Sequence, residues 1–251
     1  MPADAKALLD KVHMTVPAPP PGDEWVAEAV KAVEASITKL IDEFRAQPFI
    51  HRVEHSLHVR LMQLLSEWEH LRGWYPIDDS GFKTQLIHKE WPETRPRKKK
   101  PELIVDRRRD SFDVVVLAPS QLAKATLEQF TVGRIDVPIV IELGLGYWND
   151  HLRGDREKLT NSRVQHPCLV HLSRMPSGYQ EETEVTVAGI EAPTQIAYVH
   201  HDLEQKKVYF SYLGSPDTQI EDSTSWATVA QRAIRTLGHA AEQARLPFGV
   251  P

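Results

Sequence analysis

Residues 137–147 read VPIVIELGLGY, an apolar run interrupted by a single acid, Glu142. Strands that are covered on both faces of a sheet have near-continuous apolar sequences of this kind. A second run, SFDVVVLAP at 111–119, is rich in β-branched residues and carries Asp113 near its start. The two runs predict neighbouring buried strands, each with one carboxylate in an apolar setting.

Further elements are predicted outward from these two strands. Alternating or short apolar runs predict three more strand regions, the third a hairpin: 85–93, 167–174, and 194–202 with 207–214. Apolar residues at helical spacing predict four helices: 23–46, 52–71, 149–159 and 225–246. The order of helices and strands indicates an α/β fold.

The domain organisation follows from the same pattern. Residues 1–22 end in PAPPPG and are expected to form a flexible lead-in. The remainder, 23–251, is expected to form a single α/β domain, because no internal repeat or second linker interrupts it. Within it we predict a helical N-terminal extension (23–48), a core of about 50–215 and a closing helix (225–246).

Composition excludes several classes of protein. Of the 251 residues, 41% are hydrophobic and 26% charged, which are ordinary globular values and exclude a disordered or collagen-like chain. The single cysteine, Cys168, excludes an intramolecular disulfide. With no apolar leader and no apolar run near the roughly 18 residues of a membrane span, we expect a cytoplasmic protein without a membrane partner.

The charge is distributed unevenly. The whole chain carries −5, whereas residues 95–109 contain eight basic and two acidic residues. This basic stretch is expected either to be a solvated loop or to contact phosphates of a nucleic acid. The residues expected to bind nucleic acid are Arg97, Lys98, Lys99, Lys100, Arg107, Arg108 and Arg109.

Three carboxylates occupy positions where apolar residues are expected. Asp113 and Glu142 interrupt strands, and Glu54 continues the apolar stripe of the helix over 52–71. A buried ionised carboxylate is costly unless it is paired or bound to a metal. Mg²⁺ takes carboxylate oxygens as ligands, and such a metal activates water and stabilises phosphoryl charge. The pattern therefore predicts a site for Mg²⁺ or Mn²⁺.

A fourth acid and two basic side chains belong to the strand predicted over 85–93. By the two-residue period of a strand, Glu90 shares a face with His88, and Lys89 lies on the opposite face. Only one of Glu90 and Lys89 is then expected to point at the site.

In their order, these elements resemble the PD-(D/E)XK nuclease superfamily, which has the restriction-endonuclease-like fold. The resemblance covers about residues 50–174, and the order of the elements carries it more than any single short motif. Its segments are VEHSLHVRLMQLL (53–65), IHKEWPE (87–93), FDVVVLAP (112–119), IVIELGLGY (139–147), GDREKL (154–159) and CLVHL (168–172).

The resemblance implies a mixed sheet flanked by helices, with Asp113 and Glu142 as metal ligands and Glu54 as an additional acid. It also implies a lysine two residues after the third-strand acid, but that position is Gly144. We expect a basic residue from another element to replace this lysine. Lys158, in the helix that follows, is the first choice, and Lys89 is the second.

Three functions are consistent with these residues. The resemblance implies a Mg²⁺-dependent nuclease, a hydrolase of phosphodiester bonds in nucleic acid, with DNA expected ahead of RNA. The alternative is a catalytically inactive subunit of a defence or mobile-element system, which Gly144 favours. A hydrolase of small phosphate esters is a weaker third alternative. The partners left open are a second copy of the chain or another protein.

Each candidate also has a structural explanation. Asp113 would cap a turn, Glu142 would pair with a basic residue such as Arg153, and Glu54 would be a solvated acid near a helix N-terminus. Three histidines at helix-compatible spacing are interpreted as exposed or rim residues rather than zinc ligands, since further ligands are not evident. These are His51, His55 and His58.

Overall fold

The computed structural model of the chain describes residues 22–93, 111–146, 149–162, 164–174, 194–215 and 218–222. The predicted lead-in before Gly22, the basic stretch and the predicted closing helix at 225–246 lie outside the described residues.

A seven-stranded mixed sheet forms the centre of the described part of the chain. Its three middle strands, β5, β6 and β7, run parallel, and the strands outside them pair antiparallel. In spatial order the strands are β3 (Ile87–Pro92), β4 (Ser111–Val116), β5 (Ile139–Leu145), β6 (His166–Ser173), β7 (Gln195–Asp202), β8 (Lys207–Ser211) and β9 (Gln219–Asp222).

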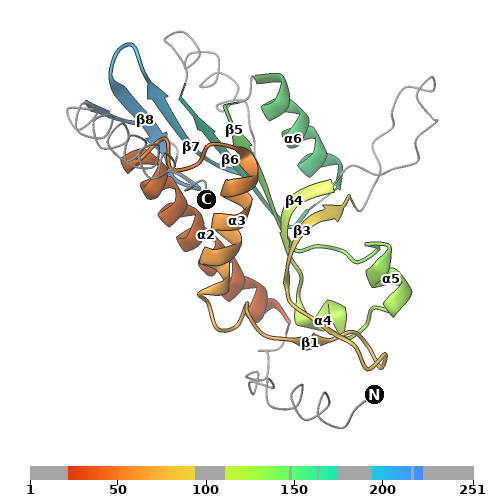
Figure 1. Cartoon of the computed structure of the whole chain (residues 1–251). Coiled ribbons are helices and arrows are strands. Elements are labelled where there is room, and N and C mark those ends of the chain that lie inside the picture. Colours follow the sequence, from red (N-terminus) through yellow and green to blue (C-terminus); the bar gives the residue numbers. More distant parts are fainter. Residues whose placement is uncertain are drawn as a thin grey trace, which may run out of the picture.

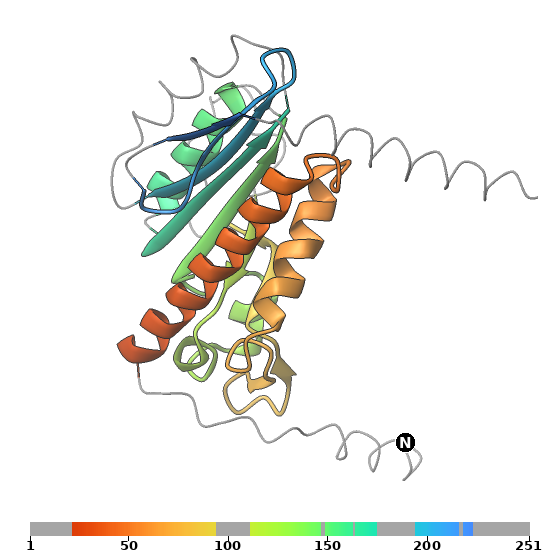
Figure 2. The same ribbon diagram turned by 90° about the vertical axis from the view of Figure 1, so that its left-hand side faces the viewer.

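Helices cover both faces of this sheet (Figures 1 and 2). On one face, α2 (Asp23–Ala46) packs on β6 and β7, and α3 (Glu54–Ser66) packs on β3, β4 and β5. On the other face, α6 (Asn149–Ser162) packs on β5 and β6. The protein is therefore an α/β protein whose large mixed sheet is flanked by helices, as the sequence predicted.

The helix predicted as an N-terminal extension is a layer of the core. In α2, Trp25, Val33, Ile37 and Ile41 are buried at helical spacing. Burial of each such side chain contributes about 1.5–3 kcal/mol. The helix begins at Asp23, so Gly22 is its N-cap. None of the described helices combines the length and the hydropathy needed to cross a membrane.

The position of β5 in the middle of the sheet explains its apolar sequence. It is hydrogen-bonded to β4 on one side and to β6 on the other, and α3 and α6 cover its two faces. Residues 139–143 are therefore essentially inaccessible to solvent, including Glu142. The strand thus carries a carboxylate into the interior between the sheet and α6.

Several short elements were not predicted, and α3 is shorter than predicted because it ends at Ser66 rather than near residue 71. Elements of two to five residues are too short to establish a hydrophobic period. The unpredicted elements are β1 (Tyr75–Pro76), β2 (Lys83–Thr84), β9, α4 (Pro119–Leu122) and α5 (Leu127–Thr131).

Candidate active site

The two strand acids come together where β4 and β5 separate. The antiparallel ladder pairs Val116 with Ile139 and Val114 with Ile141, and its continuation by one step would set Asp113 opposite Glu142. There the ladder ends, and Asp113 Oδ2 instead accepts a hydrogen bond of 2.8 Å from the backbone N–H of Leu143. The two acids therefore lie on neighbouring strands, as the sequence predicted.

Glu142 is a fully buried acid with one partner. Its Oε2 lies 2.7 Å from Lys158 Nζ, whereas its Oε1 is buried and accepts no hydrogen bond from the described residues. Burial, together with the negative charges of Asp113 and Asp155, raises the pKa of Glu142 well above its usual range, although Lys158 opposes the shift. A buried carboxylate with an unsatisfied oxygen favours the approach of a cation.

Lys158 comes from α6 and brings a basic group to Glu142, which the sequence does not supply at Gly144. Its Nζ lies 3.3 Å from Asp155 Oδ1 and donates a hydrogen bond of 3.2 Å to the backbone oxygen of Ser111, besides its contact with Glu142. Burial opposes its charge, but the surrounding carboxylates outweigh this effect and raise the pKa of Lys158. The side chain is therefore a buried ammonium group at neutral pH.

The first turn of α3 brings Glu54 and His58 beside Asp113. His58 Nε2 lies 3.9 Å from Glu54 Oε1 and 3.8 Å from Asp113 Oδ2. Burial lowers the pKa of His58, and Asp113 partly offsets this effect. All three predicted acids thus lie around one part of the molecule, with His58 between two of them.

Arg174 fixes the connection that leads into α3. Directly after β6, its guanidinium donates hydrogen bonds to the backbone oxygens of Pro48 (2.5 Å) and His51 (2.8 Å). The chain between α2 and α3 is thereby attached to the end of the central sheet. This attachment sets where α3 starts and so where Glu54 lies.

The expectation that the three α3-region histidines are exposed or rim residues is wrong for two of them. His51 and His58 are buried, and His55 is exposed. His58 follows Leu57 and precedes Leu61 on the face of α3 that packs on the sheet. The position of His58 within the apolar stripe of this helix was the signal that it is buried. Its contact with Asp113 was not predicted from the sequence.

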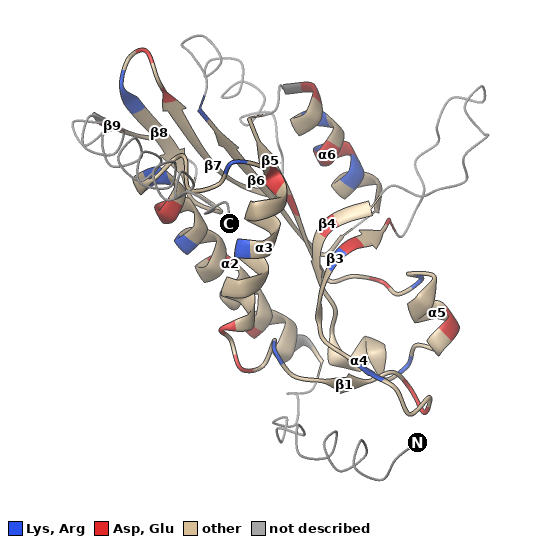
Figure 3. Cartoon of the chain, in the orientation of Figure 1, with Lys and Arg blue, Asp and Glu red and all other residues tan. Residues whose placement is uncertain are grey.

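A second feature that sequence reasoning missed is the pair of His151 and Asp155 on α6. His151 Nδ1 lies 2.8 Å from Asp155 Oδ2, and the other oxygen of Asp155 faces Lys158. The hydrogen bond to Asp155 is the main reason why the pKa of His151 is raised. The signal was a histidine four residues before an aspartate, which places both on one helix face. Figure 3 shows acidic positions in α3, β4 and α6 around this end of the sheet.

The predicted alternation in β3 fails at Glu90. Glu90 has φ of 56°, and the Lys89 and Glu90 side chains form an ion pair instead of pointing to opposite faces. A positive φ in a non-glycine residue interrupts the regular pleat, which is why the two-residue period does not apply. Both side chains influence the pKa of His58, whereas neither is among the charges that shift the pKa of Glu142.

Two other predicted neighbours lie elsewhere. His88 Nε2 lies 2.9 Å from the backbone oxygen of Gln85, and its ring packs against Trp91 and Phe130, so it does not accompany Glu90 at the site. Arg153 lies 3.5 Å from Asp150 and is not the partner of Glu142. Seven predicted nucleic-acid-binding residues, from Arg97 to Arg109, lie outside the described residues.

The fit of a divalent cation depends on two carboxylates. Within the described residues, no group of three or more histidine, cysteine, aspartate or glutamate side chains is arranged to hold a metal ion. Mg²⁺ is nevertheless commonly bound by one or two carboxylates, with waters and substrate phosphate oxygens completing its shell. Asp113 together with the unsatisfied Oε1 of Glu142 is compatible with that mode.

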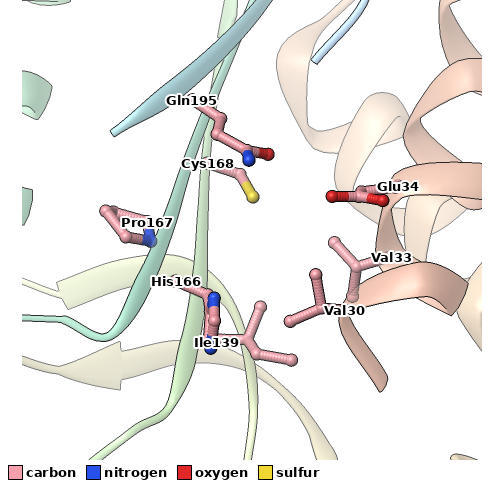
Figure 4. Close-up of a pocket in the computed structure, with 8 residues that line it drawn as sticks. All are labelled: Val30, Val33, Glu34, Ile139, His166, Pro167, Cys168 and Gln195. Atoms are coloured by element: carbon pink, nitrogen blue, oxygen red, sulfur yellow. The ribbon is translucent and has the colours of Figure 1, made fainter. Parts of the chain in front are cut away.

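A small cavity elsewhere does not compete with this site. It lies between α2 and the beginnings of β5, β6 and β7, where Val33 and Glu34 face Ile139 and Cys168 (Figure 4). Its volume of about 30 Å³ leaves room for water but not for a substrate. Burial raises the pKa of Cys168 to about 12, so its thiol is unreactive.

Comparison of the chain with protein-family models, with curated proteins and with solved structures found no match. The geometry of the cluster formed by Glu142, Asp113 and Lys158 is therefore the basis for inferring a function.

Proposed function

We propose that the chain is a divalent-metal-dependent phosphodiesterase that acts on nucleic acid and has a restriction-endonuclease-like fold. The observation that carries the proposal is the contact of 2.7 Å between Lys158 Nζ and Glu142, with Asp113 on the neighbouring strand. The element order α3, β3, β4, β5, α6 and β6 supports the fold assignment.

In this proposal Asp113 and Glu142 hold Mg²⁺ or Mn²⁺, which supplies a polarised water and stabilises charge on the phosphoryl group. Glu54 orients water at the edge of the site. Lys158 places a protonated amine beside Glu142 and donates hydrogen bonds to the attacking water or to the developing negative charge. Its burial keeps that charge effective, because little water screens it.

Nucleic acid is the proposed substrate because the basic stretch directly precedes β4 in the chain. Seven of its eight arginines and lysines, from Arg97 to Arg109, would contact phosphates on either side of the scissile bond. DNA remains the first choice and RNA the second. Contacts of this kind position the backbone and carry no sequence preference.

A specific observation favours a second candidate function, an inactive interaction subunit. Lys158 pairs with both Glu142 and Asp155, so the charges of these buried carboxylates are partly compensated within the cluster itself. Such a cluster is also what remains when a nuclease fold loses its metal and keeps its buried ion pair.

Cleavage of plasmid and oligonucleotide DNA and RNA with Mg²⁺ or Mn²⁺ tests the proposal. We expect the wild type to cleave, and Asp113→Ala and Lys158→Met to lose at least 10²-fold in rate. Asp113→Asn is the matched variant, because its side-chain oxygen still accepts from Leu143 while the charge is lost. Mn²⁺ binding measured by calorimetry should be lost in both Asp113 variants and survive in Lys158→Met.

The control is Glu157→Ala, an exposed position on the same helix as Lys158. If the wild type cleaves no nucleic acid with either metal and calorimetry detects no Mn²⁺ binding, the nuclease proposal is refuted and the interaction subunit is favoured.

A further inference from the structure

We propose that His151, oriented by Asp155, donates the proton that the leaving oxygen takes up when the phosphodiester bond breaks. This inference rests on the proposed function and adds a residue to which neither the sequence analysis nor the resemblance assigned a role. Helix α6 would then supply both Lys158 and the proton donor of the site, His151.

The geometry that supports this role is a continuous chain of polar contacts. Glu142 contacts Lys158 at 2.7 Å, Lys158 contacts Asp155 at 3.3 Å, and Asp155 contacts His151 at 2.8 Å. Asp155 is buried, so it holds the imidazole at a fixed place next to the lysine. The His151 side chain is 41% exposed, which lets the ring meet a substrate from solvent.

The charges around His151 come from three elements. On its own helix, Asp155 accepts from Nδ1, and Lys158 opposes protonation. From α3, Glu54 favours the protonated ring, and on β6 the charge of His151 helps to lower the pKa of the buried His171. The carboxylates outweigh the unfavourable contributions and raise the pKa of His151, which favours the imidazolium form.

Hydrolysis of the phosphodiester bond consumes one water molecule, and each proton and electron pair in it can be followed. The oxygen of a water molecule forms a bond to phosphorus and releases its proton to solvent. The bond between phosphorus and the bridging oxygen breaks, and its electron pair stays on that oxygen. His151 transfers the proton of Nε2 to the same oxygen, and the neutral imidazole then takes a proton from solvent. Asp155 stays ionised throughout and orients the ring.

An acid is needed only when the leaving group is a poor one. An alkoxide leaving group is strongly basic and gains from protonation, whereas a thiolate is stable without it. The test therefore uses oligonucleotides whose bridging oxygen at one scissile position is replaced by sulfur, in 3′-bridging and 5′-bridging forms. Each is compared with the ordinary oligonucleotide at the same metal concentration.

We expect His151→Gln to lower the cleavage rate of the ordinary oligonucleotide by about 10²-fold or more, within the usual range for an acid catalyst. Cleavage of the sulfur-substituted oligonucleotide that expels the thiolate should change by less than about threefold, since no proton is needed. His151→Ala should behave in the same way, and the exposed-site control Glu157→Ala should alter neither substrate. Lys158→Met should slow both substrates, because its charge acts on the phosphoryl group.

The outcomes separate the two proposals. If the wild type cleaves and His151→Gln slows both oligonucleotides equally, or neither, His151 is not the acid, and the nuclease proposal stands. If the wild type cleaves neither oligonucleotide, the nuclease proposal fails and this inference fails with it. In the active wild type, loss of rate at alkaline pH should disappear in His151→Gln, and a retained alkaline limb would also count against the assignment.

Discussion

Replacing Lys158 with methionine removes the ammonium group that lies 2.7 Å from Glu142 and keeps an unbranched side chain of similar length. The buried carboxylate then loses the only hydrogen-bond donor that it contacts among the described residues. Breaking one partner of a buried ion pair costs about 3–5 kcal/mol when the other charge stays in place.

The cost should depend on pH, because Glu142 can take up a proton. The folded protein already raises the pKa of Glu142 well above the 4.5 of an unperturbed glutamate, mainly through burial, and the loss of Lys158 raises it further. A group with a raised folded pKa contributes stability that is fully present below the unfolded pKa and is lost as pH rises through the folded pKa. In Lys158→Met, the free energy of unfolding should therefore fall by about 1.4 kcal/mol per pH unit above 4.5.

Urea denaturation of wild type and variants at pH 5, 6, 7 and 8 measures this dependence. We expect the free energy of unfolding of Lys158→Met to fall further than that of wild type as pH rises, because wild-type Glu142 keeps the partner that opposes its raised pKa. Glu142→Gln combined with Lys158→Met should recover part of the stability lost in Lys158→Met, since the charge of Glu142 is removed and Asp155 keeps its contact with His151. Glu157→Ala serves as the control for a change on the surface of α6.

A Lys158→Met protein as stable as wild type at pH 8, or equally destabilised at every pH, would refute the reasoning. Either result would mean that Glu142 reaches water or another cation and that the contact with Lys158 does not set its ionisation. The experiment needs no enzymatic activity, so it tests the cluster whichever function the protein has.

Other expected outcomes concern histidines and the basic stretch. Asp155→Asn should move the pKa of His151 down toward 6.5, followed by NMR titration of the imidazole protons, and an unchanged value would contradict the pairing. Burial lowers the pKa of His171 to about 4, so its contribution to stability is present above pH 6.5 and is lost on acidification toward pH 4. Urea denaturation should show this loss as a fall on the order of 3 kcal/mol in the free energy of unfolding. His171→Leu should abolish this part of the pH dependence. Replacement of Lys98, Lys99 and Lys100 with alanine should weaken nucleic-acid binding and flatten its salt dependence by roughly 0.7–0.9 in log–log slope per lost phosphate contact, and an unchanged binding curve would identify a solvated loop.

The major helices and strands could be predicted because hydrophobic periodicity is a local property of the sequence. β5 was recognisable from its apolar run, and α2 from residues such as Ile37 and Ile41 at helical spacing. Asp113 and Glu142 stood out for the same reason, because a carboxylate within a buried strand conflicts with the surrounding pattern. That conflict is visible without any knowledge of the fold.

The partners of those acids could not be predicted in this way. Lys158 and Lys89 were both available to replace the missing lysine, and only the packing of α6 on β5 brings Lys158 to Glu142. Similarly, His58 meets Asp113 because α3 lies over β4, although the two residues are 55 positions apart in the sequence.

Local backbone geometry also could not be predicted from the alternation of residues in a strand. The positive φ of Glu90 turns its side chain toward Lys89, and the end of the ladder at Val114 lets Asp113 take a backbone donor from β5. Local patterns were enough to predict the major helices and strands and to single out the acids, since both depend on neighbours along the chain. Only the tertiary structure decided which charges meet, because strand register and helix packing join segments that no local period relates.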